Sequence, residues 1–152
     1  MVCGVLAGCG AFLVGCGCDL QGCMTGVVIT GQVEQSAPAE VDYELCRNGE
    51  CVSGTVVEQT SPGSMQCTVS EAPFESTLCL WWPKNGIREV TGEVNLGRSH
   101  LAPTDGDRYT LRMSEQATAR ELAATDQRLS YESYNPNGSG CPGECKTASL
   151  GL

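Results

Sequence analysis

Basic residues are scarce in this 152-residue chain: nine Lys and Arg stand against 18 Asp and Glu, which gives a formal net charge of −9. Because no basic stripe is available to neutralise phosphates, the composition argues against a nucleic-acid partner. Phenylalanine is scarce as well, with two residues, whereas there are 19 glycines and seven prolines. This composition predicts many turns around a modest hydrophobic core.

Histidine is almost absent, since His100 is the only one. A serine or cysteine nucleophile would have a single imidazole available as its base, and no Gly-x-Ser-x-Gly elbow occurs. Zinc sites usually contain Cys-x-x-Cys pairs or several histidines, and the chain has neither. Asp105-Gly106-Asp107 lacks the further oxygen ligands of a calcium loop and is typical of a tight turn. We therefore expect no catalytic residue, metal or cofactor, and no enzymatic activity.

Cysteine, by contrast, is abundant. The eleven cysteines are at positions 3, 9, 16, 18, 23, 46, 51, 67, 79, 141 and 145. In a small chain rich in turns, this content is typical of structural disulfides that form in an oxidising compartment. The cysteines therefore predict an extracytoplasmic protein.

The first sixteen residues are uncharged and mostly apolar, with glycines between the apolar residues, and they end in Leu13-Val14-Gly15-Cys16. This run is too short for a transmembrane helix, which needs ~20 mainly apolar residues, and it suits the apolar region of a signal peptide. Its end resembles the lipobox of bacterial lipoprotein signal peptides. In that family the peptide is cut before the cysteine, whose sulfur carries a diacylglyceryl group. The resemblance implies a signal peptide over residues 1–15 and a lipidated, membrane-anchoring tether over residues 16–25, acylated at Cys16.

A second lipobox, Leu6-Ala7-Gly8-Cys9, is the alternative. Cutting before Cys16 leaves eight cysteines beyond the lipidated one, an even number suited to four disulfides, whereas cutting before Cys9 leaves nine. Cys16 is therefore preferred as the lipidation site. In the lipoprotein family an aspartate after the lipidated cysteine favours the inner membrane; Gly17 stands there, which favours the outer membrane. An uncleaved anchor or a buried N-terminal strand is a further alternative.

From Gly26 onwards the chain alternates between short apolar runs and turn residues. β-Branched or alternating patterns predict strands at residues 27–33, 41–47, 50–56, 65–69, 77–82, 87–96, 109–113 and 146–152. Residues 114–124 are good helix formers, and we expect a turn followed by a strand running to Tyr134, with a short helix as the alternative. Eight or nine strands predict an all-β, antiparallel sandwich of immunoglobulin-like type over residues 26–152.

Asn48-Gly49 is the preferred filling of a two-residue type I′ turn, because both of its residues must take positive φ. The turn predicts a hairpin in which Cys46 faces Cys51 at a non-hydrogen-bonded pair, within reach of a disulfide. The same register gathers the apolar residues on one face of the hairpin: Val41, Tyr43, Leu45, Val52 and Val56.

Pairing the other cysteines with their sequence neighbours predicts disulfides Cys18–Cys23, Cys67–Cys79 and Cys141–Cys145. Eight cysteines permit 105 pairings, so only Cys46–Cys51 is supported by geometry. The Cys-x-x-Gly-x-Cys hairpin and the Asn-Pro-Asn-Gly…Cys…Cys segment near the end resemble uncharacterised secreted bacterial proteins. That resemblance implies no activity.

Trp81-Trp82 is the candidate binding surface. Adjacent residues of a strand point to opposite faces, so one of the two rings is expected outside the core, where it could anchor a partner. The alternative is that a second sheet or a loop covers it.

Together these features predict a membrane-anchored extracytoplasmic lipoprotein of the cell envelope, on its outer-membrane, periplasmic or cell-surface side. We expect a non-catalytic binding or structural module with a protein or carbohydrate partner and no nucleic-acid partner. The alternative is a small secreted enzyme or a thiol-redox or metal-binding protein, which would have free thiols or depend on His100.

Overall fold

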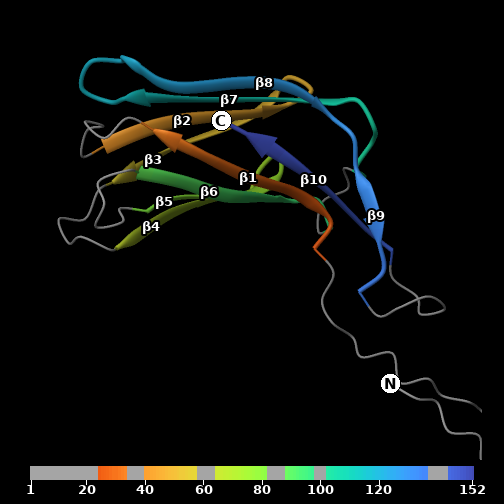
Figure 1. Ribbon diagram of the computed structural model, residues 1–152. Coiled ribbons are helices and arrows are strands. Elements are labelled where there is room, and N and C mark those ends of the chain that lie inside the picture. Colours follow the sequence, from red (N-terminus) through yellow and green to blue (C-terminus); the bar gives the residue numbers. More distant parts are fainter. Residues whose placement is uncertain (1–23, 34–39, 58–63, 82–87, 98–101, 137–143) are drawn as a thin grey trace, which may run out of the picture.

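The computed structural model describes residues 24–33, 40–57, 64–81, 88–97, 102–136 and 144–152. Within these residues ten β-strands form two sheets that pack face to face as a sandwich (Figure 1). This confirms the prediction of an all-β sandwich. Residues 1–23, which contain the predicted lipobox and most of the predicted tether, and His100 lie outside the described residues.

Sheet A has six strands and sheet B has four. The order in sheet A is β4 (Met65–Ser70), β5 (Glu75–Trp81), β6 (Arg88–Asn95), β1 (Gly26–Val33), β10 (Cys145–Gly151) and β9 (Glu132–Tyr134). The order in sheet B is β3 (Glu50–Val57), β2 (Glu40–Arg47), β7 (Asp107–Glu115) and β8 (Glu121–Leu129).

One pairing departs from the antiparallel arrangement that the sequence predicted. β1 and β10 run parallel, with Gly26 opposite Thr147 and Thr30 opposite Gly151, whereas the other strand pairs are antiparallel. Antiparallel neighbours can be joined by a short hairpin, but parallel neighbours need a long connection. Here almost the whole domain separates the two strands, so no local turn restricts their direction.

The β2–β3 hairpin has the register that its turn predicted. Asn48 and Gly49 have φ values of 52° and 90°, and Cys46 pairs with Cys51. Tyr43 lies opposite Gly54, where an added Cβ would come within 2.9 Å of the tyrosine ring, so the glycine leaves room for the ring. The five apolar residues that the register placed on one face are all buried: Val41, Tyr43, Leu45, Val52 and Val56.

The core lies between the two sheets and is filled by alternate residues of the longer strands. Sheet A contributes, among others, Val27, Ile29, Leu78 and Leu80, and each is 0–1% exposed. Because side chains alternate along a strand, the residues between these point away from the core. Sheet B contributes Tyr109, Leu111 and Met113 from β7 in addition to the hairpin residues.

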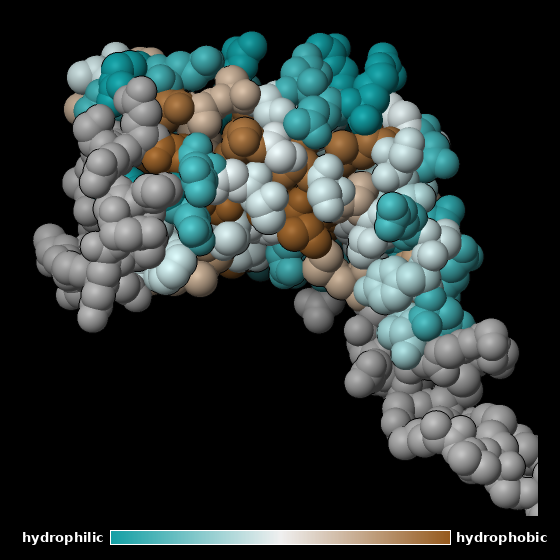
Figure 2. Space-filling view, in the orientation of Figure 1, coloured by the Kyte–Doolittle hydropathy of each residue, from teal (hydrophilic) through white to brown (hydrophobic). Residues whose placement is uncertain are grey.

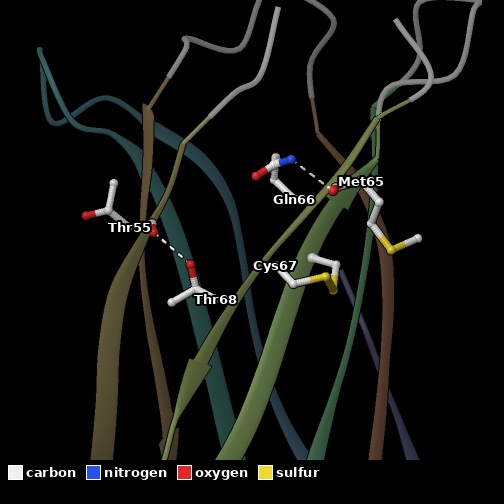
Figure 3. Close-up of a disulfide and its surroundings, with 6 residues drawn as sticks. Thr55, Met65, Gln66, Cys67 and Thr68 are labelled. Atoms are coloured by element: carbon white, nitrogen blue, oxygen red, sulfur yellow. Dashed lines mark hydrogen bonds between the residues drawn. A yellow bond between two sulfur atoms is a disulfide. The ribbon is translucent and has the colours of Figure 1, made fainter. Parts of the chain in front are cut away.

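The two sheets also touch along one edge, where β3 of sheet B runs beside β4 of sheet A. The Thr68 hydroxyl donates a 2.8 Å hydrogen bond to the Thr55 carbonyl, and Figure 3 shows this bond crossing from β4 to β3. The Tyr43 and Ser70 hydroxyls are 3.0 Å apart and link the same two sheets. The two bonds join β4 to β3 and to β2 without a continuous backbone ladder.

The ambiguous segment after β7 is a turn followed by a strand, as expected. A turn at residues 116–118 leads into β8, which pairs with β7 along its length. The short helix is therefore wrong, because pairing and the packing of Leu122 and Ala123 against the core override helix propensity. A continuous strand to Tyr134 is wrong too: β8 ends at Leu129, and the chain crosses to sheet A, where β9 begins.

In the orientation of Figure 1, the surface of the molecule is divided into hydrophilic and apolar regions. Figure 2 shows hydrophilic residues along the upper rim, where Figure 1 places β7 and β8, and apolar residues in a band below it. No helix among the described residues is long and apolar enough to cross a membrane.

Candidate functional site

The outward-facing side of sheet A is the largest continuous strand surface of the described residues that points away from the core. We call it the outer A face and define it by the residues that alternate with the buried ones. Its members are Val28, Thr30 and Gln32 of β1, Met65, Cys67 and Val69 of β4, Glu75, Thr77, Cys79 and Trp81 of β5, Glu89, Thr91, Glu93 and Asn95 of β6, Glu132 and Tyr134 of β9, and Thr147 and Ser149 of β10.

Exposed apolar side chains gather on the outer A face. Five large apolar residues of the described chain are clearly exposed, and four of them lie here: Val28 at 39%, Met65 at 54%, Val69 at 59% and Tyr134 at 43%. The fifth, Val57, is on β3 of sheet B. Single exposed apolar residues need no explanation, but their concentration on one face is typical of an interaction surface.

The Cys67–Cys79 disulfide lies at the centre of the β4–β5 part of this face. It joins directly opposed residues, with Met65 opposite Trp81 on one side and Val69 opposite Thr77 on the other. Figure 3 shows Met65 and the disulfide on one side of β4, and Gln66 and Thr68 on the other. The cross-link therefore holds β4, an edge strand, in the register that presents Met65 and Val69.

Trp81 is the part of the predicted tryptophan surface that the structure describes. Its ring is half-buried on the outer A face, opposite Met65 on one side and Glu89 on the other. Trp82 lies outside the described residues. Sequence reasoning identified the tryptophan but missed Met65, Val69, Val28 and Tyr134, because it did not show which strands share sheet A.

A second part of the outer A face is hollowed. Val28, Glu132, Tyr134, Thr147 and Ser149 line a shallow groove of about 430 Å³ where β1, β10 and β9 lie side by side. Its lining combines hydroxyl groups with a valine and a tyrosine. Exposed apolar side chains are therefore found on β4, β1 and β9, and the polar outward residues of β6 separate those of β4 from those of β1 and β9.

The charges on the outer A face are all negative among the described residues. Glu75, Glu89, Glu93 and Glu132 point outward, and no lysine or arginine of the described chain accompanies them. Lys146 lies on the opposite side of β10, together with the buried Ala148, and Arg88 is 8% exposed on the inner side of β6.

These carboxylates are not arranged as a metal site. The only described group of three potential ligands within 4.8 Å of one another is Glu44, Cys46 and Cys51, on the outside of sheet B. Cys46 and Cys51 are joined in a disulfide, so neither sulfur is a free thiolate, the form that binds metal.

The outward side of sheet B carries charges of both signs. Arg108, Arg112 and Arg128 are exposed. Arg112 lies opposite Glu44, and Arg108 lies opposite Arg128 but is paired with Asp126. Arg108 donates two hydrogen bonds to the Asp126 carboxylate, from Nε at 2.8 Å and from Nη2 at 2.5 Å. These bonds lower the pKa of Asp126. The arrangement is a hydrophilic surface whose charges compensate one another.

A buried ion pair joins the end of β2 to the start of β7, two neighbouring strands of sheet B. Arg47 donates from Nε and Nη2 to Oδ2 of Asp107, at 3.0 and 2.6 Å, and both side chains are about 5% exposed. Asn48 donates to Oδ1 of the same carboxylate at 2.7 Å, and the Tyr131 hydroxyl donates to Oδ2 at 3.2 Å. We call Arg47, Asn48, Asp107, Tyr109 and Tyr131 the polar corner.

The electrostatics of the polar corner favour the charged pair. Burial alone would raise the pKa of Asp107, but hydrogen bonds from Asn48 and Arg47 outweigh it and the pKa is lowered. Burial likewise opposes the charge of Arg47, yet the hydrogen bond to Asp107 leaves its pKa raised. Burial and the bond to Tyr109 raise the pKa of Tyr131 far above its usual range. The hydroxyl therefore stays protonated and donates.

The polar corner is structural, because its polar atoms are occupied by one another. Its side-chain atoms are not among the described buried atoms that lack a hydrogen bond. Sequence reasoning missed this cluster, although a signal was present. Arg47 follows the buried positions Val41, Tyr43 and Leu45 at a spacing of two, and Asp107 precedes Tyr109 and Leu111 in the same way. Two opposite charges at core-facing positions of neighbouring strands predict a buried pair.

The predicted disulfides Cys46–Cys51 and Cys67–Cys79 are both present, each with a Cα–Cα distance of 4.0 Å. Cys145 is buried and disulfide-bonded. The remaining cysteines of the predicted set, Cys16, Cys18, Cys23 and Cys141, lie outside the described residues.

Asp105-Gly106-Asp107 forms the predicted turn, with Gly106 at a φ of 90°. The Asp105 carboxylate accepts the Tyr131 backbone N–H at 2.9 Å, and Asp107 belongs to the polar corner. Both carboxylates are therefore engaged by the chain itself.

Comparison with known proteins gives no matching family, no similar curated protein and no similar solved structure. The function therefore has to be argued from the surface of the sandwich.

Proposed function

We propose that the protein is a lipid-anchored, extracytoplasmic module of the cell envelope that binds a partner through the outer A face. The observation that carries the proposal is the gathering of four of the five exposed large apolar residues on that face. Apolar surface left in water is unfavourable by ~25 cal/mol per Å², so a partner that covers it gains binding free energy.

A binding role fits the polar groups better than catalysis does. Nucleophilic or acid–base catalysis needs a titratable group that can reach a substrate. Tyr131, whose pKa is raised far above its usual range, and Arg47 both bind Asp107, so these groups are occupied by one another. We therefore propose a non-enzymatic module.

The extracytoplasmic location is supported by the disulfides and by the lipobox resemblance. All five described cysteines are disulfide-bonded, which is typical of proteins that fold in an oxidising compartment. The alternative of a thiol-redox or metal-thiolate protein would need free thiols. Two or more acyl chains at Cys16 would anchor the module stably, whereas one chain is marginal.

We propose that the sandwich is immunoglobulin-like in its architecture, and not in its disulfides. Two aligned β-sheets around one core are the shared architecture. Cys46–Cys51 and Cys67–Cys79 each join neighbouring strands of one sheet, whereas the disulfide of an antibody domain crosses between its two sheets.

The intact mass of the protein from the membrane fraction tests the anchor and the compartment together. We expect a chain that starts at Cys16, carries acyl mass and takes up no alkylating reagent until reduction exposes eight thiols. Cys16→Ala should release the protein from membranes, and Cys9→Ala is the matched control that should not. An unlipidated chain that retains Met1 and has freely alkylated cysteines would overturn the proposal.

A further inference from the structure

We infer that the partner of the outer A face is a basic protein surface, whose lysine or arginine side chains contact Glu89 and Glu93 while its apolar side chains pack on Met65 and Val69. This inference rests on the proposed binding role of the face. It adds that the partner is basic and partly apolar, because the face is acidic and its strand register places apolar residues beside the glutamates.

Glu89 and Glu93 have neutral neighbours on the adjacent strands, and no opposite charge among the described residues is paired with either. Glu89 lies between Trp81 of β5 and Gln32 of β1, and Glu93 lies between Thr77 of β5 and Val28 of β1. Neither forms an ion pair with another described residue. On the outward side of sheet B, by contrast, Asp126 is paired with Arg108.

The strand register places an exposed apolar residue and a glutamate in the same row twice. Met65, Trp81 and Glu89 form one row across three strands, and Val69, Thr77 and Glu93 form a second row. In both rows an exposed apolar residue on β4 lies two strands from a glutamate on β6, which is ~10 Å at a strand spacing of ~4.8 Å. The row between them contains the Cys67–Cys79 disulfide and Thr91, which carry no charge.

The spacing of Glu89 and Glu93 indicates the kind of ligand that would suit them. Glu89 and Glu93 are four residues apart on one strand, so their backbone positions are separated by ~13 Å at ~3.3 Å per residue. That distance is too large for one metal ion, and these carboxylates belong to no described group of potential metal ligands. It suits an extended surface that presents two separate cations, with apolar groups beside them.

A second copy of the chain fits this face less well. On the outside of sheet B, Arg108 is paired with Asp126 and Arg112 lies opposite Glu44, and each chain has a net charge of −9. Two copies would therefore repel one another at long range. A basic partner would instead be attracted, and its association would weaken with salt.

The test uses the purified full chain and a fluorescein-labelled peptide of alternating lysine and valine, with a peptide of alternating glutamate and valine as control. Fluorescence anisotropy measures the dissociation constant at low salt and at 300 mM NaCl. We expect the lysine peptide alone to bind, and to bind more weakly at high salt. If the lysine peptide does not bind, the inference is overturned. The proposed anchor is tested separately, by the acylated mass at Cys16, and would still stand.

Matched charge reversals locate the binding. Glu89→Lys combined with Glu93→Lys should weaken binding at least tenfold. Glu40→Lys combined with Glu121→Lys makes the same change in net charge on exposed residues of sheet B and should change it less than threefold. Equal losses in the two double variants would show that only net charge matters, and would overturn the inference.

The apolar half of the face is tested with Met65→Gln combined with Val69→Thr, which should also weaken binding about tenfold. Val57→Thr, an exposed valine on sheet B, is the control that should leave binding unchanged. Bound peptide should slow amide hydrogen exchange in β4, β5 and β6 and not in β7 and β8. Protection confined to β7 and β8 would contradict the inference.

Two further outcomes assign the face to a different occupant. Binding of a neutral oligosaccharide such as maltotetraose, unchanged by the Glu89 and Glu93 reversals but lost with Trp81→Ala, would make it a carbohydrate site. Dimers in analytical ultracentrifugation that these reversals abolish would make it an interface between copies. Either result would overturn a basic protein partner.

Discussion

The outer A face and the polar corner differ in how their side chains are satisfied. In the polar corner, Arg47 and Asp107 are buried, charged and fully hydrogen-bonded within the chain. On the outer A face, Met65 and Val69 are more than half exposed, and Glu89 and Glu93 form no ion pair with another described residue. The corner therefore contributes to folding, whereas the face leaves apolar and acidic side chains exposed, as the proposed binding role requires. Changes in the two regions should separate stability from binding.

The largest effect on stability is expected from Asp107→Asn. It leaves Arg47 buried without its counter-charge, and breaking a buried pair in this way costs about 3–5 kcal/mol. Urea denaturation followed by circular dichroism measures the loss. Binding of the lysine–valine peptide, measured where the variant is folded, should be unchanged.

The double variant Arg47→Met with Asp107→Leu is the control for that prediction. It removes both charges and should recover much of the lost stability, because apolar pairs often replace buried ion pairs at no cost. A loss below about 1 kcal/mol for Asp107→Asn would mean that the pair is solvated and the corner is not a buried structural unit.

Acid unfolding gives an independent measure of the same carboxylate. The pKa of Asp107 in the folded protein is below its ordinary value of 3.8. Its contribution to stability is therefore complete at neutral pH and is lost as the pH falls from about 4 through the folded pKa. The free energy of unfolding of Asp107→Asn should vary less with pH below 4 than that of the unmodified protein. Parallel pH profiles would show that other carboxylates control acid unfolding.

The two described disulfides should differ in both stability and binding. Replacing Cys67 and Cys79, 12 residues apart, by serine should cost about 3 kcal/mol, and replacing Cys46 and Cys51, 5 residues apart, about 2 kcal/mol, since longer loops lose more entropy when closed. Only the first pair lies on the outer A face. Its removal should also weaken peptide binding, whereas equal binding by both variants would show that the cross-link does not support the face.

The smallest effect on stability is expected from Met65→Gln and Val69→Thr. Both side chains are more than half exposed, so each substitution should change the free energy of unfolding by less than about 0.5 kcal/mol. The same substitutions are expected to weaken binding, as described above. A large loss of stability, measured by urea denaturation, would show that these residues are covered in the folded protein and serve its packing.

Features set by neighbouring residues were predictable from the sequence. Asn48-Gly49 determined a turn, the turn determined the register, and the register placed Cys46 opposite Cys51. Features that depend on distant parts of the chain were not. The parallel pairing of β1 with β10 has no local signal, and the change of sheet after Leu129 depends on contacts with the turn at Asp105.

The candidate site shows the same division. Trp81 was identified from its side-chain type, but the rest of the outer A face depends on which strands lie side by side in sheet A. The polar corner left a trace in the alternation of β2 and β7, at Arg47 and Asp107. Considered together, two opposite charges at these core-facing positions predict a buried ion pair.

The position of β1 has a mechanical consequence for the N-terminal tether that we propose. β1 lies inside sheet A, paired with β6 at eight positions and with β10 at five. A pull on the preceding tether acts along the strand and loads both ladders in shear, so many hydrogen bonds resist it together. An edge strand such as β4 would instead unzip one pair at a time. In the anchored arrangement that we propose, the domain would therefore stay folded when a partner on the outer A face draws it away from the membrane.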